Sequence, residues 1–223
     1  DYGAVSGDGS DASAALKACL GEAEKTDRTV WIPAGEFRLD SQPIDLGKVT
    51  VTGAGLWHTR LTGTAPMFRG TGHPVQFSHL AIFGEVDHRY DQRSDNAFSG
   101  NFGNGSRFEH LWIEHLKCAF WTMHGTLNMT VSHCRIRNTM ADGINFCDGT
   151  SQSTVEYSHF RNTGDDALAT WSPTGEWSSP TACIGNAFMH NRIEVPWHAN
   201  GIAIYGGADH RVIGNTISDT VYS

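Results

Sequence analysis

Residues 130–146, TVSHCRIRNTMADGINF, are repeated in outline by residues 154–170, TVEYSHFRNTGDDALAT, at a shift of 24 positions. A repeat of this length, built from short β-type runs that end in Asn, Gly or Asp, is typical of a solenoid with one coil per repeat. Neighbouring coils of a parallel β-solenoid lie about 4.8 Å apart. The repeat therefore predicts that Asp142 and Asp166 are stacked on successive coils, with Asp165 as a further carboxylate beside them.

The rest of the chain fits a single elongated all-β domain over residues 1–223, with one helix near its start. Apolar residues between Ala12 and Ala23 recur at helical spacing, which predicts an amphipathic helix with Asp11 as its N-cap. This helix would cover the open end of the solenoid. Polar residues 85–105 and 171–181 are expected to be loop excursions that wall a groove. Because the chain stops at Ser223 just after a strand-like run, we expect it to be a fragment that lacks C-terminal coils.

Composition and charge indicate which classes of partner and cofactor are disfavoured. The formal net charge of −8, with Lys and Arg scattered, disfavours nucleic acid or another polyanion. No apolar run reaches the roughly 18 residues needed to cross a bilayer, so we expect no contact with a membrane. We also expect the protein to be a monomer. The five cysteines lack C-x-x-C spacing and the density of a disulfide scaffold, and we expect mostly buried thiols. No cofactor or metal is indicated, although a structural Ca²⁺ would be compatible with the sequence.

The three aspartates are the candidate catalytic residues. Stacked carboxylates disfavour each other's ionisation, so at least one pKa in the cluster should rise, whereas stacked amides such as Asn138 and Asn162 form a hydrogen-bonded ladder. Glycosidic hydrolysis needs one protonated and one ionised carboxyl group, and a cluster of acids supplies both. Asp165 and Asp166 are adjacent in sequence. Both can face one cleft only if the chain bends at Gly164.

Residues near these acids are candidates for contact with a sugar. Continuing the repeat places Ala119, Asp142, Asp166 and Asn200 in one column along the coils. Aromatic side chains suit the apolar faces of pyranose rings, and their polar edges can form hydrogen bonds. The predicted substrate-binding residues are Asn145, Trp171, Trp197, His198, Asn200 and Tyr205, with Trp121 and Trp177 as further aromatic residues near the acid-bearing turns.

Two parts of the sequence resemble known proteins. Residues 1–11, DYGAVSGDGSD, and 30–39, VWIPAGEFRL, resemble the N-terminal part of the right-handed parallel β-helices of the pectate-lyase-like superfamily. Residues 141–145, ADGIN, and 163–169, TGDDALA, resemble glycoside hydrolase family 87, the α-1,3-glucanases also called mutanases or mycodextranases. This resemblance implies a secreted enzyme that cleaves a neutral α-glucan internally with inversion. It also implies that Asp165 is the general acid and that Asp142 and Asp166 position and deprotonate the attacking water.

Three other functions remain open on this scaffold. A polygalacturonase resembles the same arrangement of one upstream Asp and a downstream Asp-Asp pair, but residues 199–203, ANGIA, differ from its Gly-His-Gly and no Arg-x-Lys follows. A polysaccharide lyase would need Arg or Lys, often with Ca²⁺, beside the uronate. A non-catalytic carbohydrate-binding or adhesion β-helix would use the aspartates as a ladder or a cation site.

Overall fold

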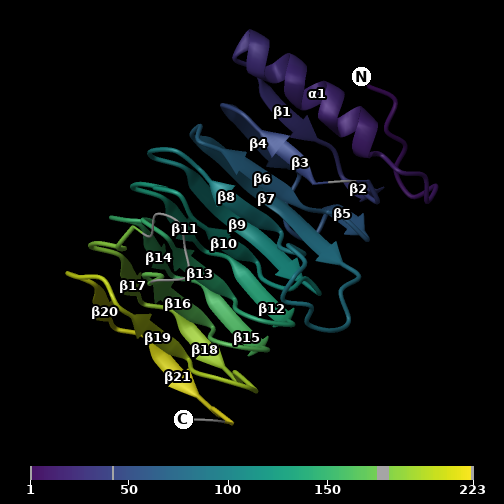
Figure 1. Cartoon of the computed structure of the whole chain (residues 1–223). Helices are drawn as coiled ribbons and strands as arrows, with labels where there is room; N and C mark the ends of the chain where they lie inside the picture. The colour runs from purple at the N-terminus through teal and green to yellow at the C-terminus, as the bar shows by residue number, and fades with distance from the viewer. Residues whose placement is uncertain (1, 42, 175–180, 222–223) are drawn as a thin grey trace.

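The computed structural model describes residues 2–41, 43–174 and 181–221, which form a parallel β-helix with helix α1 (Ser13–Thr26) across its N-terminal end (Figure 1). Among these residues the strands form two sheets that run along the solenoid. The larger sheet contains β1 (Thr29–Ile32), β2 (Gly35–Arg38), β4 (Val49–Gly53), β5 (Thr59–Gly63), β7 (Val75–Gly84), β9 (Arg107–Glu114), β11 (Thr130–Ser132), β12 (Arg135–Thr139), β14 (Thr154–Glu156), β15 (His159–Thr163), β17 (Ala187–Met189), β18 (Arg192–Glu194), β20 (Arg211–Ile213) and β21 (Thr216–Ser218). The smaller sheet contains β3 (Ile44–Leu46), β6 (Phe68–Thr71), β8 (Phe98–Asn101), β10 (Phe120–Thr122), β13 (Ile144–Cys147), β16 (Leu168–Trp171) and β19 (Ile202–Tyr205).

The register of the strands confirms the 24-residue repeat. Thr130 pairs with Thr154 in the larger sheet, and Ile144 pairs with Leu168 in the smaller one. Asp142 and Asp166, each two residues before these last partners, therefore occupy equivalent places on successive coils. The predicted amide ladder is also present, because Asn162 Nδ2 donates to Asn138 Oδ1 at 3.1 Å.

One position in the predicted column was wrong. Phe120 pairs with Ile144, so residue 118, a buried cysteine, lies opposite Asp142, and Ala119 lies opposite Gly143. The corner between β9 and β10 is one residue shorter than the corner between β12 and β13, because Glu114 pairs with Arg137. Counting forward from the preceding strand therefore placed Ala119 one position off.

The core between the sheets is built from stacked phenylalanines. Phe98 lies between Phe68 and Phe120, with ring centroids 5.5 and 4.8 Å away. Each ring comes from a neighbouring strand of the smaller sheet, so the stack follows the solenoid axis. The expectation that residues 85–105 form one loop was wrong, because Phe98–Asn101 forms strand β8 and Phe98 is fully buried. Similarly, Trp171 ends strand β16 instead of starting a loop.

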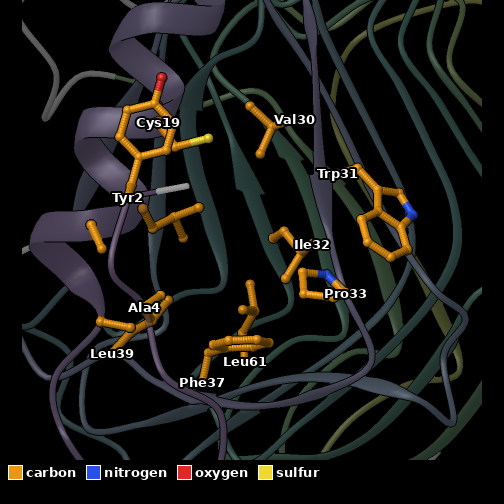
Figure 2. Close-up of a pocket in the computed structure, with 13 residues that line it drawn as sticks. Tyr2, Ala4, Cys19, Val30, Trp31, Ile32, Pro33, Phe37, Leu39 and Leu61 are labelled. Carbon is orange, nitrogen blue, oxygen red and sulfur yellow. The ribbon is translucent and has the colours of Figure 1, made fainter.

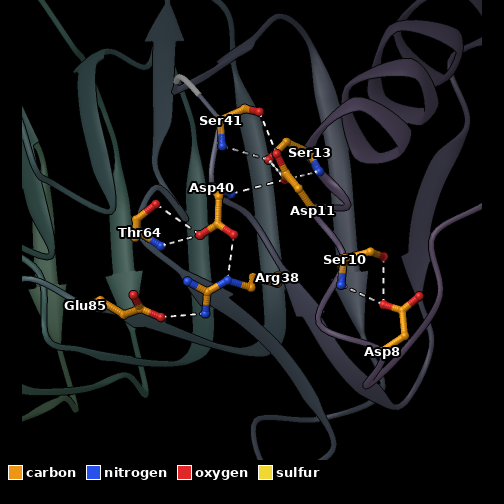
Figure 3. Close-up of polar contacts among 9 residues, drawn as sticks. All are labelled: Asp8, Ser10, Asp11, Ser13, Arg38, Asp40, Ser41, Thr64 and Glu85. Atoms are coloured by element: carbon orange, nitrogen blue, oxygen red, sulfur yellow. Dashed lines mark hydrogen bonds and ion pairs between the residues drawn. The ribbon is translucent and has the colours of Figure 1, made fainter.

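The N-terminal helix covers the first coil, as predicted, and contacts β1, β3 and β4. It begins at Ser13, so Asp11 lies one residue before the N-cap, which is Ala12. The Asp11 carboxylate nevertheless accepts the amide N–H of Ser13 at 2.9 Å, and it also binds the Ser41 hydroxyl at 2.6 Å (Figure 3). Asp11 thus joins the start of the helix to the first coil.

An apolar pocket of about 230 Å³ lies between this helix and the first coil (Figure 2). Leu16 and Cys19 line it from the helix, and Val30, Ile32 and Leu61 line it from the strands. Its lining includes no carboxylate. The five cysteines are free thiols, and all except the half-buried Cys19 are buried, as expected. Among the described residues, no helix has the length and apolar character that crossing a membrane requires.

Stacked aromatic side chains mark the corner between the two halves of the larger sheet. His79, His110 and His133 adopt positive φ on successive coils, with ring centroids 4.9 and 5.1 Å apart. Tyr157 and His190 continue the stack. Burial, followed by the charges of His79 and His133, lowers the pKa of His110.

Replacing His110 by asparagine should make the protein less sensitive to acid. A histidine whose pKa is lowered in the folded state contributes stability at neutral pH that is lost as the pH falls below about 6.5, because the unfolded chain then takes up the proton first. Asparagine tolerates the left-handed conformation and does not titrate. Urea unfolding at pH 7 and pH 5 should show a smaller loss for His110→Asn than for the wild type. The same change at His73, an exposed histidine outside the stack, should leave the loss unchanged.

Candidate active site

The acid-bearing corners lie where the larger sheet turns into the smaller one. Residues 140–143 join β12 to β13, and residues 164–167 join β15 to β16. At Gly164 the chain bends against the preceding coil, where its N–H donates to the Thr139 carbonyl at 2.9 Å. A Cβ at this position would lie 2.4 Å from the Met140 carbonyl oxygen, so only glycine fits. The bend predicted at Gly164 is therefore present.

This bend brings the three carboxyl groups together. One carboxylate oxygen from each of Asp142, Asp165 and Asp166 lies within 4.8 Å of the other two. Asp142 and Asp166 are buried, with 6% and 2% of their surface exposed, whereas the side chain of Asp165 is 25% exposed. Asp165 is thus not sealed in the core, and it is the acid that is most accessible to a ligand.

The pKa of Asp142 is raised by its surroundings. Burial, followed by the negative charges of Asp165 and Asp166, raises its pKa to about 7. A side-chain hydrogen bond from Asn145 partly opposes this increase. Asn145 was predicted to bind substrate; its side chain is buried and bonds the Asp142 carboxyl group, and its contact with substrate stays a prediction.

Asp166 is held by hydrogen bonds from the next coil. Its Oδ1 accepts the backbone N–H of Asn200 at 2.9 Å and the Asn200 side-chain amide at 2.8 Å. Burial, followed by a hydrogen bond to Asp166, raises the pKa of the Tyr205 hydroxyl to about 12. Asn200 and Tyr205, both predicted to contact sugar, therefore orient a carboxylate, although Tyr205 is also half exposed.

A groove of about 710 Å³ lies over the smaller sheet, with Asp142 on its wall. Strands β6 and β8 contribute Arg69, Ser99 and Asn101, and residues 89–96 form the opposite wall. Trp121 and Trp171 also line the groove, with ring centroids 6.0 Å apart. The groove thus combines aromatic rings, hydrogen-bonding groups and an acid, which is the composition that a sugar site requires.

Comparison with known proteins identifies the family. The family described as alpha-1,3-glucanase catalytic domain D2 matches residues 7–222. The chain belongs to this α-1,3-glucanase family. No match was found among curated protein sequences.

Solved structures of this family share the fold. The Agl-KA catalytic domain is 34% identical, with a TM-score of 0.86, and covers 100% of this chain. The catalytic unit of the thermostable family 87 α-1,3-glucanase from Streptomyces thermodiastaticus strain HF3-3 is 35% identical, with a TM-score of 0.89 and the same 100% coverage. A family 87 α-1,3-glucanase catalytic domain in complex with nigerose is 26% identical, with a TM-score of 0.76, and covers 99% of this chain. The chain spans 42%, 40% and 39% of these three structures' own lengths.

Some predicted residues of this family member lie apart from the groove wall. Trp197 and His198 lie in the corner between β18 and β19, with ring centroids 5.7 Å apart and the ring planes tilted by 49°. The Trp197 N–H donates to the Thr163 carbonyl at 3.0 Å, which places its backbone beside the Asp165 corner. Neither residue lines the groove, so their contact with sugar stays a prediction. Trp177 lies outside the described residues.

Sequence reasoning missed Arg89, which forms an ion pair with Asp165. Arg89 lies in the polar stretch between β7 and β8, 76 positions before its partner. The only signal in the sequence was the alternation of Arg89 and Arg93 with Asp91 and Asp95 in a segment expected to wall a groove. The carboxylates of this cluster are also hard oxygen ligands that could hold a divalent cation. In the structure, a guanidinium group supplies positive charge there, and we assign no metal to the site.

Proposed function

We propose that this protein hydrolyses α-1,3-glucan at internal linkages. The observation that carries the proposal is the cluster of three carboxyl groups beside an aromatic groove, with their nearest oxygens within 4.8 Å of one another. Because the pKa of Asp142 is near 7 while the site contains two other acids, the cluster can hold a protonated and an ionised carboxyl group at the same time. Hydrolysis of a glycosidic bond requires this combination.

Asp165 is the general acid in this proposal, and Asp142 and Asp166 activate the water. Asp165 is accessible, as a group that must reach the glycosidic oxygen has to be. Asp142 and Asp166 are buried, which suits carboxyl groups that hold a water molecule. Support also comes from two neighbours, 26% and 25% identical, that are Asp-to-Ala variants of a family 87 α-1,3-glucanase bound to nigerose. Their substituted positions are 24 residues apart, which is the separation of Asp142 and Asp166 here.

The reaction should proceed with inversion. Asp166 Oδ1 already accepts two N–H groups of Asn200 and is buried, so it is better placed to orient water than to attack an anomeric carbon. The nearest-oxygen separation of at most 4.8 Å is shorter than the roughly 6.5 to 9.5 Å typical of inverting enzymes and closer to the roughly 5 Å of retaining ones, so the distance does not support inversion. The proposal of inversion rests on the surroundings of Asp166. NMR of the first product decides the point, because inversion of an α-linkage releases the β-anomer and retention releases the α-anomer.

The groove favours a neutral glucan over an acidic polymer. Among the described residues, each Arg or Lys on its wall is already engaged: Arg69 with Asp45, Arg89 with Asp165, Arg93 with Asp95, and Lys117 with backbone carbonyls. A uronate carboxylate would have to compete with these partners. This pairing supports the α-glucanase proposal against the polygalacturonase and lyase alternatives.

Reducing-sugar release from α-1,3-glucan, dextran and polygalacturonate tests the proposal. We expect release from α-1,3-glucan only. Release from polygalacturonate alone would favour the acidic-substrate hydrolase. Binding of glucan without release of any sugar would favour a non-catalytic β-helix.

We also propose that the protein acts outside the cell, since its polymeric substrate is too large to enter. We further propose that it acts as a monomer.

A further inference from the structure

Arg89 is the cation bonded directly to the acid cluster. Its Nη1 pairs with Asp165 Oδ2, and its Nε donates to Asp91 Oδ1 at 2.6 Å. Arg89 is also part of the groove wall beside Asp142. One guanidinium group therefore contacts the most accessible acid of the cluster and faces the space where a sugar would lie.

The segment that carries Arg89 is tethered to the solenoid. Lys117 is buried, and its ammonium group donates to the backbone carbonyls of Tyr90 and Arg93. The backbone N–H of Lys117 donates to the Asp95 carbonyl at 2.7 Å. These contacts on the residues after Arg89 fix the position of its backbone, so the guanidinium group can leave Asp165 by side-chain rotation alone.

The ion pair between Arg89 and Asp165 affects the charge balance of the acid cluster. Among the described residues, side chains bond each of the three carboxyl groups: Arg89 pairs with Asp165, Asn145 bonds Asp142, and Asn200 and Tyr205 bond Asp166. The buried Cys118 lies beside Asp142. Lys117 is committed to backbone carbonyls. Arg89 is thus the group whose charge offsets the repulsion among the three acids most directly.

An acid that is paired with arginine cannot serve as a proton donor. A guanidinium group stays protonated and favours the ionised form of the carboxylate that it contacts. Burial and the neighbouring carboxylates raise the pKa of Asp142, so the proton of the cluster lies on Asp142 in the sugar-free arrangement. The proposed role of Asp165 as general acid requires that this arrangement change when the substrate binds.

We propose that Arg89 is a positioning residue that holds Asp165 ionised until an α-glucan chain entering the groove displaces its guanidinium group. This inference rests on the proposed function. After displacement, the O–H bond of Asp142 breaks and an O–H bond forms on Asp165, while Arg89 keeps its own proton and its contact with Asp91. Asp142 is then a carboxylate that can accept a proton from water, and Asp165 is the acid.

Arg89→Met and Arg89→Lys test this role, with Arg60→Met as the matched control. Arg60 is also a half-exposed arginine paired with a carboxylate, Glu36, but it lies on β5 in the N-terminal coils. Carbon-13 NMR of Asp-labelled protein follows the ionisation of Asp142 without any need for activity. Steady-state kinetics on soluble α-1,3-linked oligosaccharides give KM, kcat and the pH profile.

In Arg89→Met, Asp142 should titrate at a higher pH than in the wild type, because an opposite charge that stabilised its ionised form is removed. The alkaline limb of the pH profile should move in the same direction. KM should fall about two- to fivefold, because the substrate no longer has to break the ion pair between Arg89 and Asp165 when it binds. This range corresponds to the usual strength of one partly exposed ion pair. Arg89→Lys should show a smaller shift, and Arg60→Met should show none.

An unshifted Asp142 titration or an unchanged KM in folded Arg89→Met would overturn the inference. If the ion pair were purely structural, its loss in Arg89→Met would lower the free energy of unfolding and leave KM unchanged. Failure of the proposed function is distinguishable, since the wild type would then release no sugar while the NMR titration could still be measured.

Discussion

Replacing Asp165 by asparagine should lower kcat on α-1,3-glucan by about a hundred- to ten-thousandfold, the usual contribution of a general acid or base. The amide keeps the shape of the side chain but cannot donate a carboxyl proton to the leaving oxygen. Asp166→Asn should have an effect of similar size, because Asp166 orients and deprotonates the attacking water. Initial-rate measurements of reducing-sugar release at several pH values check both expectations.

A matched control separates loss of chemistry from loss of fold. Asp209 is an exposed corner residue with positive φ, a conformation that asparagine also adopts, and it lies away from the acid corners. Asp209→Asn should keep kcat within about twofold, as expected for a surface substitution away from the site. If Asp165→Asn or Asp166→Asn unfolds at the wild-type urea concentration and retains a near-normal kcat, its catalytic assignment is wrong.

Replacing Phe98 by alanine should lower the free energy of unfolding by about 3 to 5 kcal/mol, the typical cost of deleting a buried aromatic ring. Phe98 is fully buried, and its ring is stacked between Phe68 and Phe120 and meets Phe77 and Phe108 edge-on. The cavity would lie in the middle of the stack, where the neighbouring strands leave little room to collapse. Urea unfolding followed by fluorescence or circular dichroism measures the loss.

Phe83→Ala is the matched control for this substitution. Phe83 lies on strand β7 of the larger sheet, and its side chain is only half buried and packs on Trp112. Its removal should cost about 1 kcal/mol, because most of the ring is not surrounded by core atoms. Equal losses for the two variants would contradict the account of a phenylalanine stack that carries the stability of the core.

The repeat predicted the fold well because it reports the strand register directly. Thr130, Val131 and Asn138 recur 24 positions later on the next coil, so the stacking of Asp142 on Asp166 followed from counting. Strand β8 escaped prediction because Ser99, Gly100 and Asn101 give it the polar character of a loop. Its single core residue can be identified only from its partners on the adjacent coils.

The site was predicted less completely than the fold. Counting along the chain brings acids together, but it cannot tell which side chains bond the carboxylates and which face the groove. Asn145 and Asn200, which were expected on the sugar, bond Asp142 and Asp166, and their contact with a sugar stays a prediction. Arg89 was missed because it lies in an irregular segment outside the strand repeat, so its neighbours cannot be found by counting residues. Its contact with Asp165 depends on how that segment packs against the solenoid.

The measurement that tests the central claim most directly is a crystal structure of Asp165→Asn protein with an α-1,3-linked tetrasaccharide. The account predicts that the sugar lies in the groove along Trp121 and Trp171, with a glycosidic oxygen about 3 Å from the substituted residue. It also predicts a water between Asp142 and Asp166, and Arg89 turned away from residue 165. A sugar bound elsewhere on the solenoid, or one whose glycosidic oxygens all lie beyond reach of the three acids, would contradict it.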